Sequence, residues 1–235
     1  MKWREGDIHE TGLSQLEWVS EGMRRRFPAQ VDSLLPGIFP AYARLLHPLE
    51  CADSAGREVW LRWSDAADAL GATVHRQMQL GAILSNESNV DLRNHPPTQR
   101  HPTISWDDQL PELVSILRRH TTTPDSCYFA FWEGNTAFDG IPPEVPKLTI
   151  QDMRYFIFKG PISRAIDHFH GLPPTIWWTQ DRKWLVSSPD DFPSTYVGGE
   201  VGCISEILES REIEAYIALG TDPVSVDSDT LNWRY

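Results

Sequence analysis

Positive charge is scarce in this chain. Lys and Arg together number 21 against 33 Asp and Glu, which gives a net charge of −12. Binding to a phosphate backbone needs concentrated Lys and Arg, so this balance argues against a nucleic-acid partner. We interpret the basic run Arg24-Arg25-Arg26 as the solvated end of a helix, where positive charge suits the helix dipole.

Long apolar runs and paired cysteines are also missing. No stretch approaches the roughly 18 apolar residues of a membrane span, and the first residues contain no apolar segment typical of a secretory signal. Cys51, Cys127 and Cys203 are widely spaced and form no CxxC pair. We therefore expect a reduced, cytoplasmic protein without membrane association or cofactor.

Apolar spacing predicts an α+β protein with a mostly antiparallel sheet and helices packed on it. The 235 residues, of which 40% are apolar, suffice for a sizeable core. We expect one unit over residues 1–235. The Pro-, Asn- and Ser-rich stretch 84–106 is predicted as a long loop and is the candidate position for any internal boundary.

The same spacing predicts the individual elements. Predicted helices cover residues 12–27, 65–70, 108–119, 161–169 and 200–209. Predicted strands cover residues 37–47, 57–63, 127–132, 154–158, 174–178, 183–187 and 213–217. Two hairpins are expected, one joining the first two strands and one joining 174–178 to 183–187. Residues 135–152, with three prolines, are predicted to be irregular.

The most informative segment is His120–Gly134, in which a polar turn runs directly into the strand 127–132. Successive residues of this strand are apolar, so both of its faces are expected to be covered, as in the middle of a sheet. Phe129 and Phe131 are then core residues. The polar turn is held against the core, which makes its side chains candidates for a site.

Three residues of this turn are candidate ligand-binding residues: His120, Thr122 and Asp125. The imidazole offers a general base, and the threonine hydroxyl can orient a ligand. A structural role is the alternative. His120 ends a predicted helix, where a cation suits the dipole, and Thr and Asp beside Pro124 are ordinary turn formers.

A second group of candidates follows later in the chain. Asp181 and Arg182 lie in a predicted hairpin turn, Tyr196 follows, and Gly198 and Gly199 precede a predicted helix, where their N–H groups can face an anion. The spacing is not that of a phosphate loop, and turn and cap roles are again the alternative. If the two polar groups meet at one sheet edge, they form one pocket for a small anionic ligand.

Metal binding is not expected. His168 and His170 form an HxH pair, but at a predicted helix end their side chains diverge and no third ligand is near. The segment Asp227–Asn232 is similar to a calcium loop, yet it lacks the glycine and the bidentate glutamate of one. A capping or turn role is expected there.

Three motifs carry a resemblance to a family: the run His120–Gly134, the stretch Asp181–Gly199 with its DRKW and STYVGG sequences, and the tail Ser228–Asn232. In these motifs the chain resembles a family of uncharacterised actinobacterial proteins, over residues 35–232 and most strongly after residue 105. The resemblance implies no activity. It implies that the three polar segments belong to one design.

Two classes of function remain. The absence of a nucleophile–base pair favours a non-catalytic binding or protein-interaction module with an acidic, Trp-rich surface, since the chain has 10 Trp. The alternative is a small-ligand binder or enzyme with a polar pocket built from residues 120–125 and 181–199. The two differ in a testable way, because the second requires candidates from both segments to line one concave pocket.

Overall fold

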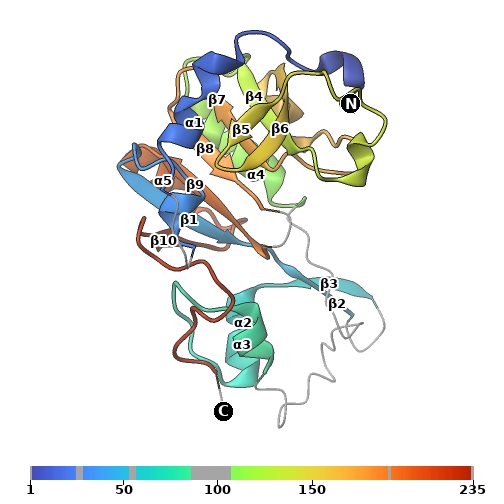
Figure 1. Cartoon of the computed structure of the whole chain (residues 1–235). Coiled ribbons are helices and arrows are strands. Elements are labelled where there is room, and N and C mark those ends of the chain that lie inside the picture. Colours follow the sequence, from blue (N-terminus) through green and yellow to red (C-terminus); the bar gives the residue numbers. More distant parts are fainter. Residues whose placement is uncertain (1, 25–28, 53–56, 86–106, 190–191, 234–235) are drawn as a thin grey trace.

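The computed structural model describes residues 2–24, 29–52, 57–85, 107–189 and 192–233. Its centre is an eight-stranded sheet in the order β10-β1-β9-β8-β7-β4-β6-β5, with every neighbouring pair antiparallel (Figure 1). The strands are β1 (Ala41–Leu46), β2 (Leu49–Ala52), β3 (Glu58–Leu61), β4 (Cys127–Trp132), β5 (Leu148–Ile150), β6 (Met153–Gly160), β7 (Ile176–Thr179), β8 (Trp184–Ser187), β9 (Ser194–Gly199) and β10 (Ala215–Ala218). The α-helices are α1 (Trp18–Glu21), α2 (Trp63–Leu70), α3 (Leu80–Leu84), α4 (Leu110–Arg119) and α5 (Val201–Glu209). The predicted α+β class is confirmed.

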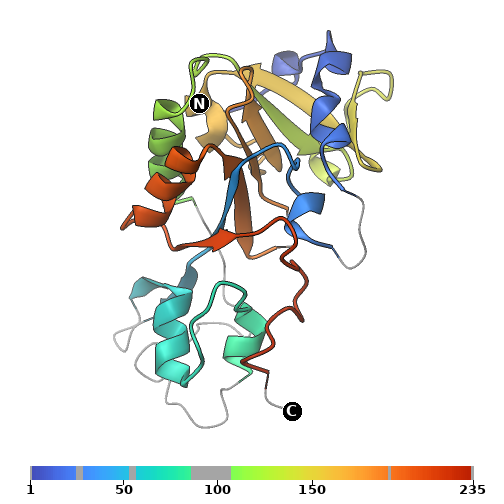
Figure 2. The same ribbon diagram turned by 90° about the vertical axis from the view of Figure 1, so that its left-hand side faces the viewer.

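Apolar layers cover both faces of the sheet. Phe129 and Phe131 of β4 face a core shared with α4 and α5, whereas Tyr128 and Ala130 face a second core that includes α1. Figure 2 shows α4 and α5 side by side on one face and α1 on the other, while Trp3 near the start of the chain packs in the core on the side of α4 and α5. The strand 127–132 is therefore covered on both faces and lies inside the sheet between β6 and β7, as predicted.

A third apolar cluster lies beyond one end of the sheet and is formed around α2, α3 and the β2–β3 hairpin. The predicted pairing of residues 57–63 with 37–47 is wrong, because β3 pairs with β2 while β1 lies between β9 and β10. Ala43 and Tyr42 of β1 face the two opposite cores. A strand that is apolar on both faces is stable only inside a sheet that is covered on both sides.

The predicted helix 12–27 is wrong in extent, since a short 3₁₀ turn precedes α1 and α1 has only four residues. Gly22 packs so closely that a Cβ there would come within 2.6 Å of the Pro36 side chain. Arg24 donates its N–H to the carbonyl of Asp32 at 2.7 Å. The chain therefore leaves the helical path near Gly22. The other two arginines of the basic run lie outside the described residues.

Smaller differences concern two further segments. The stretch 135–152 contains the strand β5 as well as irregular chain, and the predicted helix 161–169 is a 3₁₀ turn, Ile162–Ile166. The predicted hairpin of β7 and β8 is confirmed. Most of the predicted loop 84–106 lies outside the described residues.

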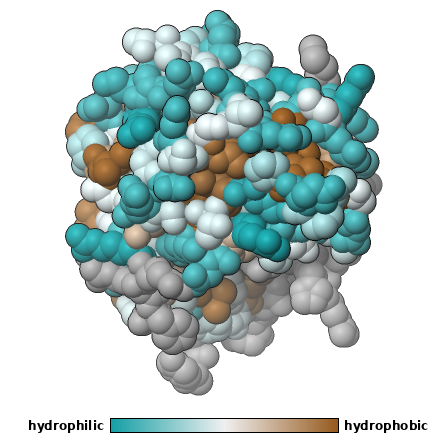
Figure 3. All heavy atoms as spheres, turned by 45° about the horizontal axis from the view of Figure 1, so that its top comes forward, coloured by the Kyte–Doolittle hydropathy of each residue, from teal (hydrophilic) through white to brown (hydrophobic). Residues whose placement is uncertain are grey.

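The tryptophans are divided between the core and the surface, where Trp60, Trp132 and Trp233 are exposed. Trp3, Trp63, Trp177, Trp178 and Trp184 are buried. The surface in Figure 3 shows apolar side chains as separate areas among hydrophilic residues, which is usual for a surface exposed to water. Within the described part of the chain, no helix has the length and apolar character to cross a membrane.

Candidate functional site

The two predicted polar segments meet where the turn before β4 lies against the turn between β7 and β8. Oδ2 of Asp181 accepts hydrogen bonds from the Thr121 hydroxyl at 2.9 Å and from the N–H and hydroxyl of Thr122 at 2.7 and 2.9 Å. The Asp181 N–H donates to the Thr123 hydroxyl at 3.1 Å. We call this contact, formed by residues 121–126 and 180–183, the polar junction.

The Asp181 carboxylate is held in its ionised form. Partial burial opposes this, because it raises the pKa of a carboxyl group, but hydrogen bonds from Thr179, Thr122 and Thr121 outweigh burial and lower the pKa to about 2. A carboxyl group with this pKa stays ionised near neutral pH. Asp181 therefore acts as a fixed acceptor that fastens two turns together, and it is poorly suited to acid–base chemistry.

Further hydrogen bonds close the polar junction. The Ser126 hydroxyl donates to the side-chain oxygen of Gln180 at 2.6 Å, and the Gln180 N–H donates to the Ser126 carbonyl at 2.9 Å. The Thr123 N–H donates to the Thr121 hydroxyl at 3.0 Å. Polar side chains that bond one another and the local backbone are typical of a structural turn.

His120 pairs with α5. Its Nε2 atom lies 2.6 Å from Oε2 of Glu206, and the other oxygen of Glu206 accepts a hydrogen bond from Arg119 at 2.9 Å. Bonds from Arg119 and then His120 lower the pKa of the Glu206 carboxyl group. These contacts join the C-terminal end of α4 to α5, so His120 has a structural partner of its own.

The remaining polar candidates do not join His120. The guanidinium of Arg182 lies over the ring of Trp18, 5.0 Å from its centroid, and Trp18 packs on the core opposite α4 and α5. Tyr196 is buried in that same core, while Asp125 is exposed. The structure thus brings Thr122 together with Asp181 and places Arg182 and Tyr196 on the other face of the sheet.

Gly198 and Gly199 are strand residues within β9, which lies between β1 and β8. A Cβ on Gly198 would come within 2.5 Å of the Phe39 ring, and one on Gly199 within 3.4 Å of Trp184. The pair therefore permits close packing. Its interpretation as a loop that presents amides to an anion does not fit this position.

The described residues give little support for a metal site or for a reactive cysteine. His168 lies 3.6 Å from Asp107, and His170 packs against the neighbouring aromatic ring. No group of three or more His, Cys, Asp or Glu in the described ranges is arranged to hold a metal ion. Burial raises the pKa of the Cys127 and Cys203 thiols to about 12, so both remain protonated and are poor nucleophiles.

The tail segment that is similar to a calcium loop serves as a turn and cap, as predicted. The buried carboxylate of Asp229 accepts N–H groups from Gln79, Leu231 and Asn232, each at 3.0 Å. Its Oδ1 atom also lies 3.0 Å from Nε2 of His75. Asp229 therefore ties the tail to the segment that leads into α3.

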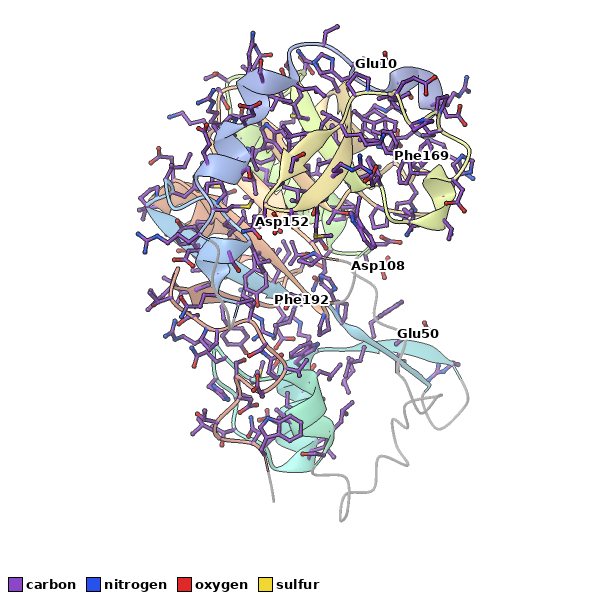
Figure 4. The ribbon with its side chains drawn as sticks, in the orientation of Figure 1. Glu10, Glu50, Asp108, Asp152, Phe169 and Phe192 are labelled. Carbon is purple, nitrogen blue, oxygen red and sulfur yellow. The ribbon has the colours of Figure 1, made fainter. Side chains whose placement is uncertain are left out.

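A hollow on the sheet face that carries α1 was not predicted. It encloses about 260 Å³ at the ends of β4, β6, β7 and β8. Its polar lining residues are Ser33, Gln151, Thr175 and Ser187. The rest of its lining is apolar or aromatic, and none of the described lining residues carries a charge. We call this hollow the sheet-face pocket. Figure 4 labels Phe192, which lines it, and Asp152, which follows Gln151.

Gln151 forms one wall of this pocket in a backbone conformation that favours glycine, with φ at 55°. It lies in the tight turn that joins β5 to β6. Its N–H donates to the Ser20 hydroxyl and its side-chain amide to the Ser33 carbonyl, both at 2.8 Å. A strained residue held by its surroundings is often found at a binding site.

Ser187 places a buried hydroxyl at the pocket. It is only 2% exposed and pairs across the strands with Ile176 and Tyr196, so its side chain shares the face of the pocket. Among the described residues its hydroxyl has no hydrogen-bond partner, and the same holds for Thr175, which is 8% exposed. The signal available in the sequence was a serine at an inward-facing position of a strand.

Comparison with known proteins adds no relative. No protein-family model, curated protein or solved structure matches this chain. The resemblance to actinobacterial proteins stays a prediction.

Proposed function

We propose that this protein is a non-catalytic binding protein whose ligand occupies the sheet-face pocket. The observation that carries the proposal is the hollow of about 260 Å³, whose described lining is uncharged and largely apolar. Small-molecule sites are concave and mostly apolar, with a few polar groups that orient the ligand, and they start at roughly 300 Å³. The hollow is concave and mostly apolar, and its volume of about 260 Å³ is slightly below this range.

The alternative, an enzyme built on the polar junction, has weaker support. Its most perturbed group, Asp181, has a pKa of about 2 and is surrounded by hydrogen-bond donors. A general base near neutral pH needs a pKa close to 7. The net charge of −12 supports the further expectation that no nucleic acid is bound, and a cytoplasmic location belongs to the same proposal.

A thermal-shift screen tests the proposal. Neutral, anionic and cationic small molecules and short peptides are added to the protein, because a ligand of the native state raises the melting temperature. We expect at least one compound to raise it in the wild type and to be recovered chemically unchanged. Turnover of that compound would contradict a non-catalytic role.

A pair of glycine variants locates the binding. In Gly134→Ala the new Cβ would lie 2.3 Å from the ring of Trp132, a pocket residue that is 36% exposed and free to shift. In the matched control, Gly140→Ala, the Cβ meets nothing within 4 Å. The ligand-induced rise in melting temperature should be smaller in Gly134→Ala than in the wild type and unchanged in Gly140→Ala. If no compound gives a rise in melting temperature that is smaller in Gly134→Ala than in the wild type, the proposal is wrong.

A further inference from the structure

We propose that the ligand of the sheet-face pocket is an uncharged aromatic molecule of one or two rings, and that Ser187 hydrogen-bonds its single polar group. This inference rests on the proposed function and names its ligand class. Three properties of the pocket support it: its charge, its size and lining, and its buried hydroxyl.

The described lining of the pocket disfavours an ionic ligand. None of its described lining residues is Asp, Glu, Lys, Arg or His. Moving an ion from water into an apolar site without a charged partner is strongly unfavourable. The carboxylates of Asp181 and Glu206 lie elsewhere, in the β7–β8 turn and on α5, where they contact Thr121 and His120. The ligand therefore carries no net charge.

The size and lining favour an aromatic ring system. A cavity of about 150 Å³ holds benzene, so a pocket of about 260 Å³ has room for a second ring. Trp132, Tyr155 and Phe192 supply aromatic surface, and Met23 and Met153 supply sulfur. Aromatic pairs and contacts between sulfur and an aromatic ring are more favourable than apolar burial alone.

The buried hydroxyl of Ser187 requires one polar group on the ligand. Ser187 as a residue is only 2% exposed and lines the pocket, and no other described residue forms a hydrogen bond with its hydroxyl. A buried polar group without a partner is destabilising, and native proteins usually satisfy such groups. A ligand hydroxyl or carbonyl in the pocket supplies the missing bond.

Calorimetric titration with three matched probes tests this ligand class: 2-naphthol, naphthalene and 2-naphthoate at pH 7. We expect 2-naphthol to bind three- to tenfold more tightly than naphthalene, which is the effect of about one hydrogen bond. We expect 2-naphthoate to bind at least about tenfold more weakly than 2-naphthol, because its charge has no partner.

Ser187→Ala then tests the hydrogen bond itself. It should reduce the affinity for 2-naphthol three- to tenfold, to that of naphthalene, and leave naphthalene binding unchanged. The melting temperature should stay the same or rise, because the removed hydroxyl has no partner. Ser205→Ala is the matched control, since Ser205 lies on α5, which packs on the opposite face. It should change neither affinity.

Each other outcome overturns the inference. Equal binding of 2-naphthoate would show a site for anions, and an equal loss of both neutral probes in Ser187→Ala would show a structural role for Ser187. If no naphthalene derivative binds but a peptide or another compound raises the melting temperature in a way that depends on Gly134, the ligand class is wrong and the proposed function stands. If nothing does so, both proposals fail.

Discussion

The polar junction and the sheet-face pocket are joined by one strand. β4 starts directly after Ser126 of the junction and ends at Trp132 of the pocket. In the junction, Asp181 accepts hydrogen bonds from Thr121 and Thr122, and Ser126 donates one to Gln180. In the pocket, polar residues are few, and the hydroxyl of Ser187 has no partner in the described structure.

The comparison teaches that a dense polar motif and a binding site can be different places. A turn against the core must satisfy its own N–H and C=O groups, and nearby Thr, Ser and Asp side chains do this at short range. A ligand site has to leave some groups unsatisfied until the ligand arrives. The conspicuous motif therefore stabilises the fold, and the inconspicuous serine is the better candidate for binding.

The largest expected loss of stability comes from a substitution in β4, the strand that joins the polar junction to the sheet-face pocket. Phe129 lies midway along β4, is fully buried and packs against Trp3, with ring centroids 5.1 Å apart. Phe129→Ala should lower the free energy of unfolding by about 3–5 kcal/mol, measured by urea denaturation. Ile166→Ala, at a side chain that is 51% exposed, should change it by less than about 0.5 kcal/mol. Equal stability of both variants would contradict the central position of β4.

Breaking the polar junction alone should have an intermediate effect. Asp181→Ala removes the acceptor of the Thr121 and Thr122 donors and should cost about 1–3 kcal/mol of unfolding free energy. Binding of 2-naphthol should be unchanged, because the pocket is at the other end of β4. Asp125→Ala, at an exposed position of the same turn, should have little effect on either. If Asp181→Ala lost 2-naphthol binding, the polar junction would be part of the binding site.

The pH dependence of stability sharpens the same contrast. The pKa of Asp181 is about 2 in the folded protein against a usual value of 3.8, so the carboxylate stabilises the fold fully above pH 4. This contribution is lost as the pH falls from about 4 towards 2, because the unfolded state binds the proton first. Urea denaturation at pH 6, 4 and 3 should show the difference between the wild type and Asp181→Asn shrinking across this window. A constant difference would mean that the ionised carboxylate contributes nothing.

The smallest expected effect is at Arg182. Its contact with the Trp18 ring is at the surface, where such a contact contributes about 0.5–1 kcal/mol. Arg182→Ala should lower stability by about that amount and leave 2-naphthol binding intact. Arg182→Gly should be more stable than the alanine variant, because φ at this position is 58°. Loss of ligand binding in both variants would place Arg182 in the site after all.

Part of the fold could be predicted because its signals are local. The apolar stripe of α4, the two-faced β4 and the turn of the β7–β8 hairpin each depend on residues within about a dozen positions, where helical or strand periodicity is readable. The contact between the two polar segments was also predicted, although its chemistry is that of a structural turn. The pocket was not predicted, because its lining comes from residues as distant as Met23 and Phe192.

The fold class, the composition of the core and the position of the polar turns follow from the amino-acid pattern alone, because burial and turn chemistry act on neighbouring residues. The pairing of β1 with β9 and β10, the end of α1 where Gly22 meets Pro36, and the burial of Ser187 beside a hollow depend on contacts between distant segments. Strand partners and cavities depend on which distant surfaces meet. A periodic pattern records which face of a strand is buried, but it does not record against what.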